Sequence, residues 1–369
     1  MPERKNSLQI HNGDCIEVMQ TLPDNSVDSI VTDPPYGLGF MGKAWDALPP
    51  GEDWARECLR VLKPGGHLLA FGGTRTWHRL AVAVEDAGFE IRDSIAWMYG
   101  SGFPKHRAAL KPAFEPIVMA RKPYKGSLTA NETEHGTGAL NIDGCRIGMS
   151  DEDRAIVDRR SGASGSHPDH YTVGSHLSRA EGERFKSAPA GRWPANVALD
   201  EHMADILDQQ SGTLKSGILE AHHSRNPKRT TGIYGDMEAT EGARGYGDSG
   251  GASRFFKVAE SDEHGAISPY FPREFDAPFM YSPKAPKKER PVVDGVAHPT
   301  VKPLALMRWL VRLVTPEGGT VLEPFAGSGA TVEACILEGF DCIAIEREPD
   351  YIPLIQARID RTAGQESAA

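Results

Sequence analysis

Residues 320–346 read TVLEPFAGSGATVEACILEGFDCIAIE, and the architecture of the chain follows from this stretch. An apolar run over 320–322 leads into a turn containing Gly327 and Gly329, after which a helical pattern and a second apolar run at 341–345 follow. Glycine at such a turn lets a ligand approach the backbone where a helix begins. The sequence therefore predicts a strand, a helix and a parallel strand, with a ligand site at the glycine turn.

Glu346 ends the second apolar run, 19 residues after Gly327. An acidic side chain at about this distance, after the second strand, is typical of sites that hold ribose hydroxyls. A nucleoside-containing cofactor is therefore expected. A dinucleotide fingerprint would place a third Gly or Ala at position 332, where this chain has Val332. This difference disfavours a pyrophosphate-binding oxidoreductase, which nonetheless stays an alternative.

The same alternation of strand and helix patterns occurs near both ends of the chain. Strands are expected at 26–32, 67–71 and 91–97, and helices at 54–63, 74–87, 302–314, 331–338 and 350–359. We expect Gly65 and Gly66 to end the first of these helices, and Gly88 to end the second. The chain is thus predicted to be an α/β protein whose two α/β pieces, 1–125 and 298–369, flank a different middle.

The middle of the chain, residues 126–297, has little periodicity and is rich in Gly, Ser, Thr and charged residues. A disordered linker would fit this composition. Twelve aromatic residues between Tyr171 and Tyr281 are more than an unpacked chain usually carries. We therefore interpret residues 126–297 as an inserted, loop-rich recognition region.

A second motif follows the strand predicted at 26–32. This strand leads directly into Asp33-Pro34-Pro35-Tyr36, which places an acid and an aromatic ring at the carboxyl edge of a parallel sheet. The two prolines fix the backbone and contribute no N–H donor, so the carbonyl groups there are rigidly presented. A carboxylate, a fixed carbonyl and an aromatic ring can together bind a flat ring that carries an exocyclic NH₂ group.

Together with His298-Pro-Thr-Val-Lys-Pro303, these two motifs resemble those of the S-adenosylmethionine-dependent DNA amino-methyltransferases. The order of the motifs, catalytic first and cofactor-binding last, resembles the beta class of that family. The resemblance covers residues 8–123 and 298–360, whereas the middle matches only in position. It implies a Rossmann-like methyltransferase sheet in permuted strand order, with a target-recognition region inserted between the halves.

The resemblance also implies roles for individual residues. It assigns catalysis to Asp33, Pro34, Pro35 and Tyr36. The Asp33 carboxylate and the Pro34 carbonyl would hold the target amino group, and Tyr36 would stack on the base. It assigns the binding of S-adenosylmethionine to Asp14, Thr300, Lys302, Glu323, Phe325, Ala326, Gly327, Gly329 and Glu346. The expected substrate is double-stranded DNA, whose target base must leave the helix to reach the cofactor.

Composition limits the classes of protein that fit. The 369 residues carry a formal net charge of −10, which argues against coating nucleic acid by bulk electrostatics but allows local basic clusters at 101–125 and 284–290. No apolar run approaches the roughly 18 residues of a membrane span, and the N-terminus lacks the pattern of a secretory signal. A cytoplasmic location is therefore expected. Five cysteines without a C-x-x-C pair, and histidines without ligand spacing, predict no metal site.

Several alternatives stay open at this stage. Asp33 at the head of the motif favours N6 of adenine in the families that it resembles, and N4 of cytosine is the next candidate. Methylation of RNA or of a protein amide is a further alternative, as is a catalytically silent DNA-binding module. The resemblance leaves open whether the chain forms a homodimer and whether it acts beside a cognate restriction endonuclease.

Overall fold

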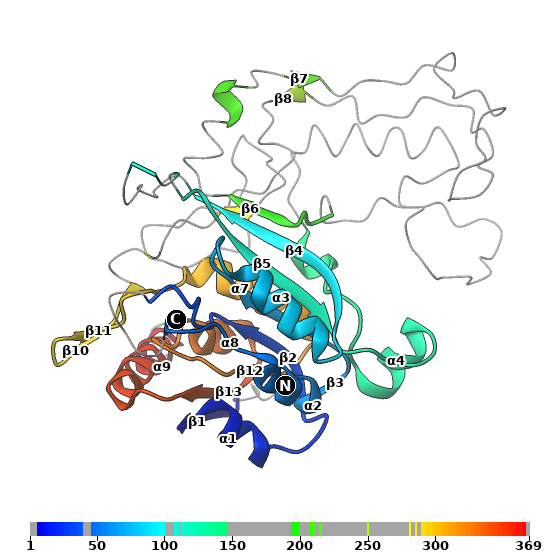
Figure 1. The fold of residues 1–369 in the computed structure, drawn as a ribbon, viewed down its shortest axis with the longest axis horizontal. Coiled ribbons are helices and arrows are strands. Elements are labelled where there is room, and N and C mark those ends of the chain that lie inside the picture. Colours follow the sequence, from blue (N-terminus) through cyan, green and yellow to red (C-terminus); the bar gives the residue numbers. More distant parts are fainter. Residues whose placement is uncertain are drawn as a thin grey trace.

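A nine-stranded mixed sheet forms the centre of the computed structural model (Figure 1). The structure describes residues 6–39, 46–99, 107–108, 110, 112–146, 193–199, 207–210, 214–215, 249–250, 280–281, 285 and 289–366. The strand order is β1-β13-β12-β2-β3-β5-β4-β6-β9. These strands are β1 (Leu8–Asn12), β2 (Val27–Thr32), β3 (Leu62–Phe71), β4 (Glu90–Met98), β5 (Phe114–Arg121), β6 (Val197–Leu199), β9 (Met280–Tyr281), β12 (Thr320–Glu323) and β13 (Asp341–Glu346).

The two halves of the chain meet inside this one sheet. Strand β12 from the C-terminal half pairs in parallel with β2 from the N-terminal half, with Leu322 opposite Ile30. Strands β1, β13, β12, β2 and β3 all run parallel, whereas β5 is antiparallel to both β3 and β4. The predicted α/β class and the permuted joining of the halves are confirmed. The carboxyl ends of the parallel strands therefore lie along one edge.

Helices cover both faces of the sheet. They are α1 (Cys15–Thr21), α2 (Glu52–Val61), α3 (Trp77–Asp86), α7 (Leu304–Val314), α8 (Ala330–Glu338) and α9 (Ile352–Glu366). Helices α7, α8 and α9 share one hydrophobic cluster, and α1, α2 and α3 share another. Successive residues of β3 alternate between these clusters: Leu69 packs on the α7 side, and Leu68 and Ala70 pack on the α1 side. This burial on both faces explains why the strands read as short apolar runs.

Most predicted helix boundaries hold to within a few residues, but α9 extends to Glu366, seven residues beyond its predicted end, and Gly65 requires a correction. The helix expected to end at the two glycines ends instead at Val61, where Leu62 already has extended dihedral angles and begins β3. Gly65 has a φ of +80° inside this strand, and a Cβ there would lie 2.4 Å from Asn131 Nδ2. Gly65 therefore permits a close approach of chain segments and does not cap the helix. Gly88, with a φ of +107°, does end α3 as expected.

The first residues of the stretch interpreted as an insert pack on the α/β core. Helix α4 (Leu128–His135) buries Asn131, whose amide donates to the Pro64 carbonyl at 3.0 Å. Cys145, in the 3-10 turn η3 (Asp143–Cys145), joins the cluster of α7. The remaining described elements of this stretch are β6, β7 (Leu214–Lys215), β8 (Ser249–Gly250), β9, β10 (Val292–Val293) and β11 (Val296–Ala297); most of 126–297 lies outside the described residues.

No helix in the described part of the chain is long and apolar enough to cross a membrane.

Candidate active site

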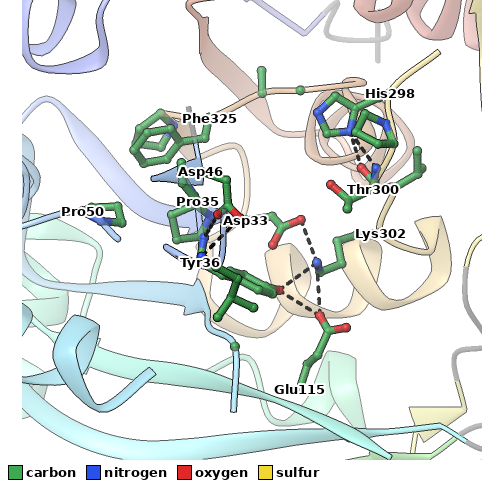
Figure 2. Close-up of a pocket in the computed structure, with 18 of the residues that line it drawn as sticks. Asp33, Pro35, Tyr36, Asp46, Pro50, Glu115, His298, Thr300, Lys302 and Phe325 are labelled. Carbon is green, nitrogen blue, oxygen red and sulfur yellow. Dashed lines mark hydrogen bonds and ion pairs between the residues drawn. The ribbon is translucent and has the colours of Figure 1, made fainter. Parts of the chain in front are cut away.

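A cleft of about 1510 Å³ lies along the carboxyl ends of the parallel strands. Its walls come from both halves of the chain, and Figure 2 shows side chains from both halves facing one another across it. Sequence-predicted residues that line it are Asp14, Asp33, Pro34, Pro35, Tyr36, Thr300, Lys302, Glu323, Phe325, Ala326, Gly327 and Glu346. The joining of β2 to β12 thus brings together motifs that lie almost 300 residues apart.

Asp33 and Lys302 form a largely buried ion pair in the cleft (Figure 2). Lys302 Nζ donates to Asp33 Oδ2 at 2.7 Å, and only 9% of the lysine side chain is exposed. The other oxygen, Asp33 Oδ1, is buried and has no hydrogen-bond partner among the described residues. A buried carboxylate oxygen without a donor is unfavourable, so this atom is suited to accept a hydrogen from a bound ligand.

Tyr36 is held by its hydroxyl group. The hydroxyl donates to Glu115 Oε2 at 2.8 Å and accepts from Lys302 Nζ at 2.9 Å. Burial, together with the Asp33 and Glu115 carboxylates, raises the pKa of Tyr36 well above its usual value, so the hydroxyl stays protonated. Burial alone would lower the pKa of Lys302, but the same two carboxylates outweigh it and raise the pKa. The pocket therefore holds a charged lysine and a neutral tyrosine.

Asp46 fixes the backbone that follows the Asp33–Tyr36 motif. Its Oδ1 accepts from the N–H groups of Tyr36 at 2.7 Å and Gly37 at 2.9 Å, and its Oδ2 accepts from Leu38 at 3.2 Å. The Asp46 side chain is almost fully buried. Three donors on one carboxylate hold this loop rigidly, which sets the position of the Tyr36 ring.

The cofactor side of the cleft is built around Glu346. Its Oε2 accepts from the Gly327 N–H at 2.7 Å and its Oε1 from the Glu348 N–H at 2.8 Å. Each carboxylate oxygen can accept a second hydrogen bond, so both oxygens retain capacity for ligand hydroxyls. Burial raises the pKa of Glu346, and the two backbone N–H groups oppose this effect. Gly327 has a φ of +51°, and a Cβ there would lie 3.1 Å from His298 Nε2.

Glu323 borders the cleft, but its carboxylate is directed at the protein. It is 2% exposed and accepts from the hydroxyls of Thr32 and Thr331 and, at 3.0 Å, from the Phe325 N–H. Burial raises its pKa to about 8. Glu323 thus ties the end of β2 to the start of α8 and shapes the site indirectly.

Gly329 is the one predicted site residue that is not among those lining the cleft. Its φ is +81°, and a Cβ there would lie 3.0 Å from the Ile355 backbone in α9. Glycine at this position permits the close packing of α9, and the glycine turn thereby serves the fold as well as the site. Asp14, in contrast, lines the cleft while capping α1 through the Ile16 N–H.

Two functional candidates, Glu115 and Asp46, were not predicted from the sequence. Neither belongs to a recognisable motif, and both reach the site only through tertiary contacts. Asp46 follows the catalytic motif by ten residues, so a carboxylate after a glycine-rich loop was the available signal. No local signal marks Glu115, which lies 79 residues from Tyr36 in the sequence.

Comparison with known proteins places this geometry in context. The sequence profile of the DNA methylase family matches residues 27–357. The Type II methyltransferase M.HindIII of Haemophilus influenzae is 26% identical over 202 residues, which cover 36% of this chain and 64% of that protein. The Type II methyltransferase M.HpaI of Haemophilus parainfluenzae is 34% identical over 118 residues, which cover 30% and 37%. In both cases the chain spans less than two thirds of the relative.

Among solved structures, the cytosine-N4-specific PvuII DNA methyltransferase aligns with a TM-score of 0.45 at 13% identity. The alignment covers 96% of this chain and 89% of that one.

Proposed function

This chain belongs to the DNA methylase family, and we propose that it transfers a methyl group from S-adenosylmethionine to an exocyclic amino nitrogen in double-stranded DNA. N6 of adenine is the favoured target. The observation that carries the proposal is Asp33 Oδ1, a buried acceptor in the cleft without a partner among the described residues. An amino group has the hydrogens that this oxygen lacks.

The residues of the cofactor side fit S-adenosylmethionine. Glu346 keeps acceptor capacity on both oxygens for the ribose hydroxyls, and Gly327 leaves room that a side chain would fill. Phe325 offers an apolar surface beside Trp54, with ring centroids 5.9 Å apart. When bound, S-adenosylmethionine supplies an electrophilic methyl group. Asp14 and Thr300, which also line the cleft, complete the proposed cofactor residues.

The chain's own residues orient the nucleophile. An exocyclic amino nitrogen is a poor nucleophile because its lone pair is delocalised into the ring. Asp33 Oδ1 would accept one amino hydrogen and the Pro34 carbonyl the other, which draws the nitrogen toward a tetrahedral geometry. Tyr36 would stack on the ring, offsetting part of the few kcal/mol needed to flip the base out of the duplex. The proton released after transfer would leave through the Asp33 carboxylate.

Adenine is preferred to cytosine because of the residue at position 33. In the families that the motif resembles, Asp-Pro-Pro-Tyr accompanies mostly adenine and Ser-Pro-Pro-aromatic mostly cytosine. N4 of cytosine is the second candidate because the same acceptors could hold its amino group. Residues 126–297 would recognise the target sequence. The proposal includes neither a homodimer nor a partner endonuclease.

The test is a methylation reaction with an isotope-labelled methyl donor. Purified protein is incubated with labelled S-adenosylmethionine and unmodified bacterial genomic DNA, and the digested nucleosides are separated by mass spectrometry. Labelled N6-methyladenine is the expected product. Labelled N4-methylcytosine would replace the first candidate by the second. No labelled base, in the presence of measurable S-adenosylhomocysteine binding, would refute the proposal.

A matched pair of variants ties the reaction to the site. Asp33→Asn should abolish most labelling, whereas Asp24→Asn should retain it. Asp24 is 70% exposed and pairs with Arg60, away from the cleft. Equal loss in both variants would indicate a general effect on folding.

A further inference from the structure

Glu115 lies beside Asp33, Tyr36 and Lys302, which we call the amino-group site, and comes from a third part of the chain (Figure 2). It lies in β5, opposite Trp97 of β4, whereas Asp33 and Tyr36 follow β2 and Lys302 precedes α7. Its side chain lines the cleft and is 17% exposed. The antiparallel pairing of β5 with β3 is what carries this carboxylate to the end of β2.

Glu115 is the second carboxylate that pairs with the Lys302 ammonium. Glu115 Oε2 lies 3.2 Å from Lys302 Nζ, which also donates to Asp33 Oδ2 at 2.7 Å. The same Glu115 oxygen accepts from the Tyr36 hydroxyl at 2.8 Å. The ammonium therefore donates to Asp33 and to the Tyr36 hydroxyl and forms an ion pair with Glu115.

The pairing of Lys302 with both carboxylates explains why Asp33 Oδ1 has no hydrogen-bond partner among the described residues. Without Glu115, the Lys302 ammonium would lose a partner, and Asp33 Oδ1 is a buried acceptor without a hydrogen bond from any described residue. Tyr36 would also lose the acceptor for its hydroxyl. We propose that Glu115 is a positioning residue that holds Lys302 and Tyr36 so that Asp33 Oδ1 stays available to the target amino group. This inference rests on the proposed function and adds a residue to it.

The same arrangement has an electrostatic consequence. The titratable groups that face Lys302 are Asp33 and Tyr36 after β2, Glu115 from β5 and His298 on its own segment. Tyr99, after β4, faces Glu115, and burial together with this carboxylate raises the pKa of Tyr99, so its hydroxyl stays protonated. Burial lowers the pKa of His298, so this ring adds no positive charge near neutral pH. Removing the Glu115 charge would lower the pKa of Lys302, because one of the two carboxylates that offset its burial is lost.

Glu115→Gln tests this role with little change of side-chain volume. We expect the single-turnover methylation rate constant to fall about 100-fold, because a misplaced acceptor and ring disturb the geometry of attack. Binding of S-adenosylhomocysteine should change by less than about twofold, because Glu115 contacts none of the groups around Glu346. Among the residues predicted to bind the cofactor it contacts Lys302, whose ammonium donates to Asp33 and to the Tyr36 hydroxyl. Between about pH 7 and about pH 10, the variant should lose additional activity at the alkaline end. There Lys302 loses its proton in the variant but keeps it in the wild-type protein.

Glu90→Gln is the matched control. Glu90 lies in β4, pairs with Arg121 at 2.6 Å and does not line the cleft, so the same change there should leave rate and pH profile unaltered. Glu115→Asp is the second variant: it keeps the charge, so it should lose rate while keeping the wild-type alkaline profile. An alkaline loss as large in Glu115→Asp as in Glu115→Gln would overturn the inference.

A double variant separates positioning from a purely structural role. Because Glu115 acts partly through Lys302, the loss of rate for Glu115→Gln combined with Lys302→Met should be smaller than the product of the two single losses. Fully multiplicative losses would overturn the inference, as would a wild-type rate for Glu115→Gln. If the wild-type protein itself methylates no DNA, the proposed function fails instead, which distinguishes the two outcomes.

Discussion

Replacing Asp33 by Asn tests the assignment of the amino-group site most directly. The change keeps the shape of the side chain but replaces one carboxylate oxygen by an NH₂ group and removes the charge opposite Lys302, which now lies 2.7 Å from Oδ2. A hydrogen bond to a charged acceptor contributes about 1.5–3 kcal/mol, so its loss in the transition state predicts a 10- to 150-fold slower methyl transfer, as an order of magnitude. Lys302 keeps Glu115 as a partner at 3.2 Å, which limits the loss of stability to about 1–3 kcal/mol.

The assay pairs single-turnover methyl transfer with calorimetric titration of S-adenosylhomocysteine. Asp33 contacts Lys302 and none of the groups around Glu346, so cofactor affinity should stay within about twofold of the wild type. Thermal unfolding of the variant, measured alongside, checks that it is folded. Cofactor affinity that falls as steeply as the rate would refute the separation of the two subsites, and an unchanged rate would remove Asp33 from the reaction.

Three further perturbations probe the surrounding structure. Glu323→Gln should remain folded, because an amide can accept from the Phe325 N–H and donate to the Thr331 hydroxyl. Since burial raises the Glu323 pKa to about 8, its contribution to stability is present below about pH 4.5 and is lost as the pH rises through 8. The melting temperature of the variant should therefore vary less than that of the wild type over this window. Gly327→Ala should weaken S-adenosylhomocysteine binding, measured by calorimetry, by about 1 kcal/mol more than Gly339→Ala. Gly339 also has a positive φ, but no described residue lies within 4 Å of where its Cβ would be. Asp46→Ala should slow methyl transfer about tenfold at unchanged cofactor affinity, because three backbone donors lose their acceptor; an unchanged single-turnover rate would contradict this.

Much of the fold was predictable because it depends on local patterns. Alternating apolar runs and helical periodicity predicted most strands and helices on both sides of the middle, although β1, α1 and β5 were not predicted. The glycine turn predicted the start of α8 close to Ala330. The error at Gly65 has a non-local cause. Its positive φ permits the approach of Asn131 in α4, which lies 66 residues away, and does not cap the end of α2.

The candidate site was predictable where a motif is contiguous. Asp33–Tyr36 and the glycine turn near Gly327 each carry their chemistry within a few residues, and the structure places both on one cleft. Glu115 and Asp46 were missed because a single acidic residue is usually a solvated surface group. Their burial and their partners depend on strand pairing and loop closure, which a linear pattern does not contain.

The sequence by itself determined the order of strands, turns and helices, and the residue types available at the ends of the strands. These properties depend on backbone conformation and on which faces are buried, and both are encoded over short distances. The tertiary structure decided which side chains meet. The Asp33–Lys302 pair spans 269 residues and exists because β12 lies beside β2, and the Tyr36–Glu115 bond exists because β5 follows β3 in the sheet. Such contacts lower the free energy only after the distant strands have paired, so the folded sheet determines the geometry of the site.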